Sequence, residues 1–295
     1  MPPIGNAPDH RPAAGELAVT TATSEEWQHV AQWAADEEWN PGLGDTACFH
    51  PTDPGGFFLG RRDGHLVSAV SIVNYSDAYA FLGYYLVHPD HRRQGLGLAT
   101  WRAAFPHAGV RTVGLDAVPA QEATYRRAGF APAHDTVRYG GRPPRPSTPT
   151  PAGVVPVTAA HLDAIADYDR RCFPADRRAF VTRWLTAPGH TALAFVRDGT
   201  LTGYGVLRPA STGHRIGPLF ADTTEAAEAL FDALAASAGP DDEVFLDVPG
   251  PRHSAHALAE DRGLTARSHT IRMYTGPVPP AEQERTFAVT SLELG

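Results

Sequence analysis

The sequence YAFLGYYLVHPDHRRQGLGLA, residues 79–99, decides how the surrounding chain folds. Its first nine residues, Tyr79 to Val87, are almost all aromatic or aliphatic and predict a buried strand. His88-Pro89 ends that strand, because proline has no N–H for the ladder and fixes φ. The run from Leu98 to Ala104 then predicts a helix. The order is therefore strand, basic glycine loop, helix.

The loop between the strand and the helix is suited to an anionic ligand. Unpaired backbone N–H groups and the positive end of the helix dipole favour phosphate at a helix N-terminus. Gly95 and Gly97 let a ligand approach the backbone closely. The loop lacks the Gly-Lys-Ser/Thr ending of a Walker A loop and the third glycine of the dinucleotide fingerprint. An ordinary helix-entry turn is the alternative interpretation.

The loop and its flanks resemble the Arg/Gln-x-x-Gly-x-Gly/Ala motif of the GNAT family of acetyl-CoA-dependent N-acyltransferases. Arg92-x-x-Gly95-x-Gly97 fits the motif, and Val87-x-Pro89 precedes it as the family expects. The resemblance implies an α/β (α+β) fold with a mixed central sheet flanked by helices, acetyl-CoA as co-substrate and no metal. The cofactor-binding residues that it implies are Leu86, Val87, Arg92, Arg93, Gln94, Gly95, Leu96, Gly97, Leu98 and Tyr125.

The resemblance also implies catalytic groups. Tyr125 opens the family's Tyr-x-x-x-Gly-Phe pattern, and as a phenol of pKa near 10 it would give its proton to the departing thiolate. A packed tyrosine bonded to a backbone carbonyl is the alternative. The N–H groups of Leu86 and Val87 are implied as donors to the developing oxyanion. Val118 departs from the family, which often has asparagine seven residues before the tyrosine.

The general base is not fixed by the sequence. No glutamate lies in the strand Tyr79–Val87. His88, Asp116 and His50 are candidates, and histidine titrates in the required pH range. A chain of water molecules without a single base fits equally well.

The segment after the first helix is a candidate for contact with the acceptor. Acidic residues beside a tryptophan can hold an ammonium group by charge and cation–π contact, and in GNAT proteins this region usually lines the acceptor site. A solvated helix end is the alternative. The predicted acceptor-binding residues are Glu38, Trp39, Asn40 and Tyr84.

Outside the loop the sequence predicts further strands and helices of a mixed sheet covered on both faces. Thr23 and Glu26 form a capping-box pattern, Asp63-Gly64 a hairpin turn and Gly129 a helix C′ position. The expected strands are 16–22, 56–62, 65–74, 79–87, 112–118 and 136–139. The expected helices are 24–39, 95–105 and 121–128, with a short helical turn at 46–50.

The second half of the chain repeats the first in outline. Four matches occur in order at nearly constant offset, which predicts a duplicated domain; chance similarity of hairpin and helix-end residues is the alternative. The matched pairs are Asp63-Gly64 with Asp198-Gly199, Leu115-Asp116 with Leu246-Asp247, Gly129 with Gly263, and Tyr139 with Tyr274.

The second copy lacks the glycine loop. The corresponding stretch, Ile216 to Glu225, has no Gly-x-Gly and places Asp222 and Glu225 at a helix start, where they would repel a diphosphate. We therefore expect tandem GNAT folds of which the second is degenerate and does not bind CoA. Its expected roles are to cover the acceptor site or to form a homodimer.

The expected organisation has five parts. A flexible tail covers residues 1–15 and a CoA-binding catalytic domain covers 16–142. A linker at 143–153 holds five prolines, which stiffen it toward an extended form. A degenerate domain then covers 154–276, and a C-terminal tail covers 277–295.

Composition limits the function classes. The chain has 295 residues, of which 42% are hydrophobic, enough for two packed domains. The net charge of −8 argues against general nucleic-acid binding and is weakly consistent with a cationic substrate. Cys48 and Cys172 are expected to be reduced thiols of a cytoplasmic protein, and neither has a recognisable nucleophile setting. The sequence contains no apolar run of about 18 residues and therefore predicts no membrane-spanning helix.

Together these features predict an N-acyltransferase that moves acetyl from acetyl-CoA directly to a primary amine. The expected acceptor is a small molecule: an amino sugar, an amino acid, a polyamine or an amine-bearing antibiotic. A protein lysine or N-terminus as acceptor is one alternative. A CoA-binding sensor without turnover is the other.

Overall fold

The computed structural model of the protein describes residues 15–145, 152–250 and 252–295. The helices are α1 (Ser24–Asp36), α2 (Asp45–Phe49), α3 (Leu96–Ala104), α4 (Glu122–Arg127), α5 (Leu162–Cys172), α6 (Arg178–Thr186), α7 (Thr224–Ala236) and α8 (His253–Asp261). The strands of the first half are β1 (Leu17–Thr21), β2 (Phe57–Arg62), β3 (His65–Asn74), β4 (Tyr79–Val87), β5 (Thr112–Ala117) and β6 (Ala131–Gly141). Those that follow are β7 (Val154–Pro156), β8 (Thr191–Arg197), β9 (Thr200–Pro209), β10 (His214–Ala221), β11 (Val244–Pro249), β12 (Thr265–Tyr274) and β13 (Thr286–Ala288).

The local signals of the sequence are found where they were expected. Strand β4 has the predicted bounds, and Thr23 and Glu26 form the capping box of α1. Asp63 and Gly64 both have positive φ, 50° and 81°, as a tight hairpin turn requires. Helix α1 ends three residues earlier than predicted, since Glu38 adopts a left-handed φ of 62°.

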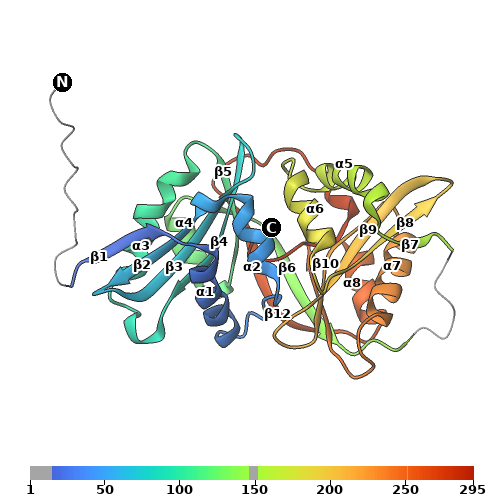
Figure 1. Ribbon diagram of the computed structural model, residues 1–295, viewed down its shortest axis with the longest axis horizontal. Helices are drawn as coiled ribbons and strands as arrows, with labels where there is room; N and C mark the ends of the chain where they lie inside the picture. Colours follow the sequence, from blue (N-terminus) through green and yellow to red (C-terminus); the bar gives the residue numbers. More distant parts are fainter. Residues whose placement is uncertain (1–14, 146–151, 251) are drawn as a thin grey trace.

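The described strands form one continuous sheet in which both halves take part (Figure 1). In the part of the chain that the structure describes, thirteen strands belong to it, twelve of them in the order β1-β2-β3-β4-β5-β12-β6-β11-β10-β9-β8-β7. The pairs β4–β5 and β10–β11 are parallel, whereas the others are antiparallel. The fold class is therefore confirmed: two similar halves, each with a mixed sheet flanked by helices.

The two halves exchange their last strands. Strand β12 of the second half pairs with β5, and β6 of the first half pairs with β11. The two exchanged strands also pair with each other from Thr265↔Gly140 to Tyr274↔Ala131. In Figure 1 they lie together at the centre of the molecule. Neither half has a complete sheet without a strand of the other.

This exchange bears on the predicted division of the chain. The division of the chain into units 16–142 and 154–276 stays a prediction. In the structure, β6 and β12 each also pair with a strand of the other unit. Residues 1–14 of the predicted N-terminal tail lie outside the described residues, as do residues 146–151 of the predicted linker.

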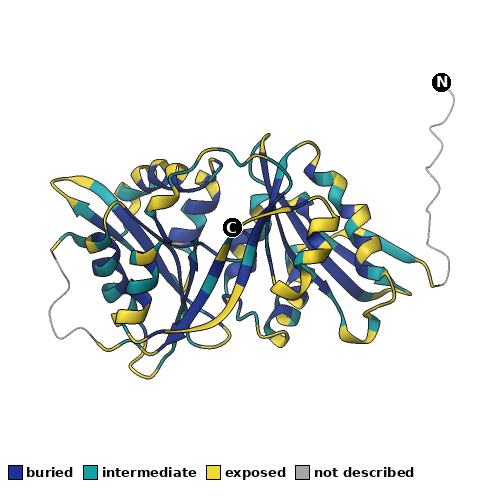
Figure 2. Ribbon diagram, turned by 180° about the vertical axis from the view of Figure 1, so that it is seen from behind, coloured by how far each residue is buried: buried dark blue, intermediate teal, exposed yellow. Residues whose placement is uncertain are grey.

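Helices of both halves meet on one face of the sheet. There α1, α2, α5 and α6 enclose a single apolar core that spans the two halves. Phe49 of α2 stacks on Trp184 of α6 with ring centroids 5.5 Å apart. Helix α3 covers the opposite face, where the Thr100 and Ser68 hydroxyls are 2.6 Å apart. Figure 2 shows most of the sheet buried, apart from exposed stretches of the central strands, and the outer helix surfaces exposed.

Residues 277–295, expected as a tail, are built into the core. Strand β13 pairs with β10, and the chain then runs between the halves to the central position of the C label in Figure 1. The carbonyl oxygen of Glu293 lies against Gly83, where an added Cβ would be only 2.0 Å away. Leu294 is fully buried in the shared core, and its carbonyl accepts a hydrogen bond from the Tyr75 hydroxyl at 2.9 Å.

Buried ion pairs connect the halves. Arg138 of β6 donates to both oxygens of Asp247 of β11, at 2.7 and 3.0 Å, and Arg215 of β10 also bonds Asp247. Asp45 of α2 pairs with Arg208 of β9 at 2.9 Å, with both side chains 1% exposed. Burial alone would raise the pKa of Asp247, but the two guanidinium groups hold it well below its usual range.

We predict that Asp247→Asn lowers the free energy of unfolding at neutral pH by about 3–5 kcal/mol, because Arg138 and Arg215 lose their buried counter-charge. A carboxylate with a depressed folded-state pKa stabilises above its unfolded pKa and loses that effect as pH falls. The difference from wild type in chemical denaturation should therefore shrink below about pH 4. Asp241→Asn, at an exposed site, is the control. If the variant and wild type differed equally in unfolding free energy at pH 7 and at pH 3, the stabilising role of the Asp247 charge would be contradicted.

We also predict that residues 16–142 do not form a stable monomer when expressed alone, because β5 then lacks the hydrogen bonds of β12. Co-expression with 154–295 should restore a complex that copurifies and unfolds cooperatively in thermal melts followed by circular dichroism. The full chain cleaved within 146–151 serves as control. A cooperatively unfolding monomer of 16–142 would refute the structural role of the exchange.

Candidate functional site

Strands β4 and β5 separate partway along their length. They pair only from Tyr79↔Thr112 to Phe81↔Gly114. At this point the register of β4 with β3 shifts, and Tyr84 takes a positive φ of 47°. Such a bulge bends the strand away from its neighbour. We call the resulting gap between residues 83–87 and 115–117 the β4–β5 opening.

One backbone amide of β4 is free to act in this opening. The His88 N–H donates to the Val67 carbonyl of the strand before β4, at 2.9 Å. Because backbone groups alternate in direction along a strand, the Val87 N–H faces away from β3. The Val87 carbonyl, on the same side, accepts from Arg92 Nε at 3.0 Å. By the same alternation the Leu86 N–H faces β3, so the geometry favours Val87 over Leu86 as a donor to substrate.

The glycine loop presents unpaired amides beside this opening. Within the described residues, no hydrogen bond is formed by the backbone N–H groups of residues 93–98. Arg93 and Gly95 have left-handed φ values of 62° and 78°. A Cβ at Gly97 would lie 2.7 Å from Val87 Cγ2 and 2.9 Å from the Tyr85 hydroxyl. Gly97 therefore lets the first turn of α3 pack directly on β4, next to the Val87 amide.

The polar side chains of the loop differ in the partners that they contact. Arg92 forms an ion pair with Glu37 at the end of α1, so its guanidinium holds the loop to that helix. Gln94 accepts from Arg62 at 3.0 Å and donates to a backbone carbonyl. Arg93 is exposed and has no partner among the described residues. Arg93 is thus the side chain available to add charge at a phosphate site, whereas Leu98 is half exposed on the surface of α3.

Tyr125 lies on the α3 and α4 side of the opening. Its ring packs against Trp101 and Phe130, with centroids 5.9 and 6.0 Å away. The hydroxyl meets no backbone carbonyl in the described chain, unlike the packed alternative considered above. Burial, together with the nearby Tyr85, raises the pKa of Tyr125, so its phenol keeps its proton at neutral pH. Tyr85, which the sequence did not single out, stands between Tyr125 and the loop.

Of the three predicted bases, His50 and Asp116 are engaged by hydrogen bonds, whereas His88 Nδ1 has no hydrogen-bond partner in the described chain. A His50 ring nitrogen is 2.9 Å from the Ala22 carbonyl. His88 packs beside Trp33 with centroids 5.3 Å apart. Asp116 is fully buried just beyond the last β4–β5 pair, and both its oxygens accept from Arg272 of β12, at 2.9 and 2.7 Å.

One further carboxylate lies near the opening. Glu293, from the C-terminal segment, has Oε1 3.5 Å from Arg215 Nη1 and is 3% exposed. Its other carboxylate oxygen, Oε2, is buried and has no hydrogen-bond partner in the described chain. No sequence pattern marked Glu293, since its partner is far away in the chain.

The segment predicted to contact the acceptor joins the two halves. The Asn40 amide donates to the Thr212 carbonyl at 3.0 Å and accepts the Thr212 N–H at 2.8 Å. Trp39 packs near the fully buried Tyr84, with centroids 6.4 Å apart, and Glu38 is exposed. A role of these residues in acceptor binding stays a prediction.

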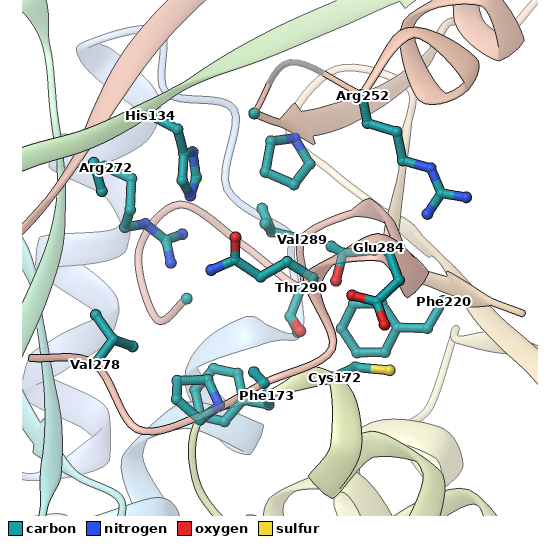
Figure 3. A pocket seen from close by; sticks show the side chains of 18 of the residues that line it. His134, Cys172, Phe173, Phe220, Arg252, Arg272, Val278, Glu284, Val289 and Thr290 are labelled. Atoms are coloured by element: carbon teal, nitrogen blue, oxygen red, sulfur yellow. The ribbon is translucent and has the colours of Figure 1, made fainter.

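A cavity of about 650 Å³ lies between the halves on the face that carries α5. Arg272 in its wall bonds Asp116 of β5, and Gly295 in its wall lies against Phe81 in the paired part of β4. Figure 3 shows Arg272 and His134 pointing into it above Phe173 and Phe220. The lining residues are Ala133, His134, Cys172, Phe173, Pro174, Phe220, Pro249, Gly250, Arg252, Arg272, Tyr274, Val278, Ala281, Gln283, Glu284, Thr286, Val289, Thr290 and Gly295.

The corresponding turn of the second half has no phosphate-binding shape. Two residues separate the end of β10 from the start of helix α7 at Thr224, and Thr223 is the N-cap of α7. Asp222 accepts from the Tyr168 hydroxyl at 2.6 Å and pairs with Arg285. In the first turn of α7, the Ala226 N–H donates to the Thr223 hydroxyl oxygen at 3.2 Å.

Two features are absent from residues 15–145, 152–250 and 252–295, the ranges that the structure describes. No group of three or more His, Cys, Asp and Glu side chains is placed to hold a metal ion. No helix in these ranges is long and apolar enough to cross a membrane.

Comparison with known families matches both halves separately. Residues 18–130 match a profile described as the acetyltransferase (GNAT) family, and residues 165–288 match one described as an acetyltransferase (GNAT) domain. The duplication predicted from four short matches is thereby confirmed.

Individual relatives match nearly the whole chain. Holothin acyltransferase from Pseudoalteromonas sp. (strain SANK 73390) is 35% identical over 274 residues, covering 93% of each chain. A crystal structure of a putative acetyltransferase from Pyrococcus horikoshii covers 98% of this chain and 99% of its own, with a TM-score of 0.80 at 19% identity. A tandem GNAT protein from the clavulanic acid biosynthesis pathway covers 89% and 99%, with a TM-score of 0.62 at 18% identity.

We predict that Gly97→Ala weakens binding of CoA, the ligand that the motif implies, by at least about tenfold. The new methyl group would overlap Val87 Cγ2 and push α3 away from β4, which spreads the loop amides. Isothermal titration calorimetry measures the affinity. Gly44→Ala is the matched control, because its Cβ would meet only His190 Nε2, at 3.8 Å. If both variants bound CoA with equal affinity, the close approach of α3 to β4 would not be required for CoA binding.

Proposed function

From the premise that this chain belongs to the GNAT family of acyltransferases, we propose that it transfers an acetyl group from acetyl-CoA directly to the primary amine of a small molecule. The relative from Pseudoalteromonas is named for acylation of one compound, holothin. The cavity of about 650 Å³ is lined by both halves and by the C-terminal segment, and a volume of this size suits a small acceptor.

The observation that carries this proposal is the convergence of three groups around one opening. The unpaired amides of residues 93–98 suit the pyrophosphate of CoA, as helix N-termini do in general. The Val87 N–H suits the thioester oxygen. Tyr125 presents an unpartnered, protonated hydroxyl on the same side as the loop. These groups come from α3, β4 and α4.

The reaction balances with these groups. The uncharged amine nitrogen attacks the thioester carbon, and a C–N bond forms as charge develops on the oxygen near Val87. The C–S bond then breaks, the amine loses one proton to solvent, and the departing thiolate takes one proton from Tyr125. Solvent returns that proton to the phenolate.

A sensor without turnover is the competing function. It would bind CoA through the same loop, but nothing in it would require an unpartnered phenol beside the opening. Tyr125 therefore separates the two functions.

We predict that Tyr125→Phe lowers kcat for acetyl transfer by about 10²–10⁴-fold, the usual range for a positioned acid, while CoA affinity stays within about twofold. Thiol release with a colorimetric reagent measures the rate, and calorimetry measures the affinity. Tyr79→Phe is the control, since its buried hydroxyl also has no partner in the described chain but lies away from the loop. An unchanged kcat would remove Tyr125 as the acid, and CoA binding without turnover of any amine would favour the sensor.

A further inference from the structure

The C-terminal segment brings a carboxylate from the second half of the chain to the β4–β5 opening. Glu293 lies against Gly83, the first residue of the opening on β4, where a Cβ would be 2.0 Å from the Glu293 carbonyl oxygen. The next residue, Leu294, is buried in the same apolar core as Tyr84. The inference drawn from this contact rests on the proposed function, because it concerns the proton that the acceptor amine loses in that reaction.

Strand hydrogen bonds in the second half hold the segment in place. Strands β10 and β11 are parallel over only three residue pairs and then separate, as β4 and β5 do. Strand β13 enters the gap and pairs with β10, and the Val289 N–H donates to the Asp247 carbonyl of β11 at 3.0 Å. The gap that is open in the first half is therefore occupied in the second half by the chain itself.

A turn after this anchor orients Glu293. The hydroxyl of Ser291, which is fully buried, accepts the N–H groups of Glu293 and Leu294, at 3.2 and 3.0 Å. The Tyr75 hydroxyl of the first half donates to the Leu294 carbonyl at 2.9 Å. Glu293 is thus held by backbone contacts to both halves, and such a fixed position is what a catalytic group requires.

The carboxylate of Glu293 is buried but only partly satisfied. It is 3% exposed, its Oε1 is 3.5 Å from Arg215 Nη1, and its Oε2 has no hydrogen-bond partner in the described chain. Arg215 already has Asp247 as a hydrogen-bonded counter-ion. A role as counter-charge for Arg215 therefore does not use Oε2, and a buried carboxylate oxygen without a partner is costly.

Two more unpartnered groups lie near this oxygen. The Tyr84 hydroxyl and Arg208 Nη2 are both buried and have no hydrogen-bond partner among the described residues. Burial raises the pKa of Tyr84, and the charge of Glu293 raises it further. Burial lowers the pKa of Arg208, whereas the charges of Asp45 and Glu293 raise it. Since buried polar groups are normally bonded to protein, water or ligand, these three atoms mark a place for a small polar molecule.

This place and Tyr125 are on opposite faces of the sheet. Tyr84 and Leu86 of the opening belong to the core under α1 and α2, whereas Tyr85 packs with Tyr125 in the core beside α3. A carboxylate on one face and a phenol on the other therefore flank the opening. The charged and titratable side chains around the carboxylate come from α2, β4, β9, β10 and β11: Asp45, Tyr84, Arg208, Arg215 and Asp247.

We propose that Glu293 is the general base of the acyl transfer and receives a proton of the acceptor amine through a water molecule bound to Tyr84 and Arg208. The protonated amine gives one N–H proton to this water, which gives one of its own to Glu293, so the nitrogen becomes uncharged. The nitrogen then forms the C–N bond, the C–S bond breaks, and the other proton transfers are those of the proposed reaction. Glu293 returns its proton to solvent after the products leave.

The first test uses two pairs of acceptors in which each pair has nearly the same shape. Ethylamine and benzylamine are protonated at neutral pH, whereas O-methylhydroxylamine and O-benzylhydroxylamine are uncharged. With acetyl-CoA at about pH 7, Glu293→Gln should lower kcat/KM at least about a hundredfold for the protonated amines, the usual effect of losing a general base. The loss for the uncharged amines should be no more than about threefold.

The pH dependence separates this role from a structural one. The deficit of Glu293→Gln with the protonated amines should shrink from about pH 7 to about pH 9, because more of each amine is then uncharged in solution. A merely structural role would lower kcat/KM equally for both members of a pair at every pH. Such an equal loss, or no loss with the protonated amines, would overturn the proposal. Glu282→Gln, at a partly exposed partner of Arg171 in the same segment, is the control.

The second test keeps all charges in place. Tyr84→Phe removes a hydroxyl that bonds no described residue, so it tests the water path even if Glu293→Gln fails to fold. It should lower kcat/KM about tenfold for the protonated amines and no more than about twofold for the uncharged ones. Tyr79→Phe, whose buried hydroxyl belongs to the paired part of β4, is the matched control. If the two variants behaved alike, the water path would be refuted.

His88 is the competing base, because its Nδ1 also has no hydrogen-bond partner in the described chain. A loss confined to the protonated amines in His88→Gln, with none in Glu293→Gln, would assign the proton to His88 and overturn the proposal while the proposed acyl transfer stands. If wild-type protein bound CoA but acylated none of the four amines, the proposed function itself would be refuted, and the role of Glu293 with it.

Discussion

The hydrogen bonding of β12 to β5 is the contact on which the rest of the structure depends. It closes the sheet of the first half with a strand of the second, and the reciprocal pairing of β6 with β11 closes the other. It also sets Arg272 opposite Asp116, so the wall of the cavity is made at the same point. The site is therefore a product of two halves that do not complete their sheets separately.

Because of this pairing, the second half has a structural role although it has no glycine loop. Its turn before α7 is filled by Asp222 and its partners, yet it supplies β12 and most of the cavity wall. The C-terminal segment then returns through the core and places Glu293 against Gly83 of β4. The second half thus contributes a strand to the sheet of the first half and residues to the cavity wall.

Features set by neighbouring residues could be predicted from the sequence. The bounds of β4, the capping box at Thr23 and the left-handed turn at Asp63-Gly64 each follow from a few adjacent side chains. The strand exchange could not be predicted, because β5 accepts either last strand with the same backbone hydrogen bonds. The pairing of Asp116 with Arg272, 156 residues apart, depends on that choice. From the sequence, Asp116 was therefore one of three candidates for the general base.

The exchange also has a chemical consequence for the acceptor. By bonding both oxygens of Asp116, Arg272 engages a carboxylate at the edge of the opening that could otherwise take a proton. A lysine-like amine, with a pKa of about 10.4, is almost entirely protonated at neutral pH and would need such a group. In the proposed reaction the amine must therefore lose its proton to water or to a group other than Asp116.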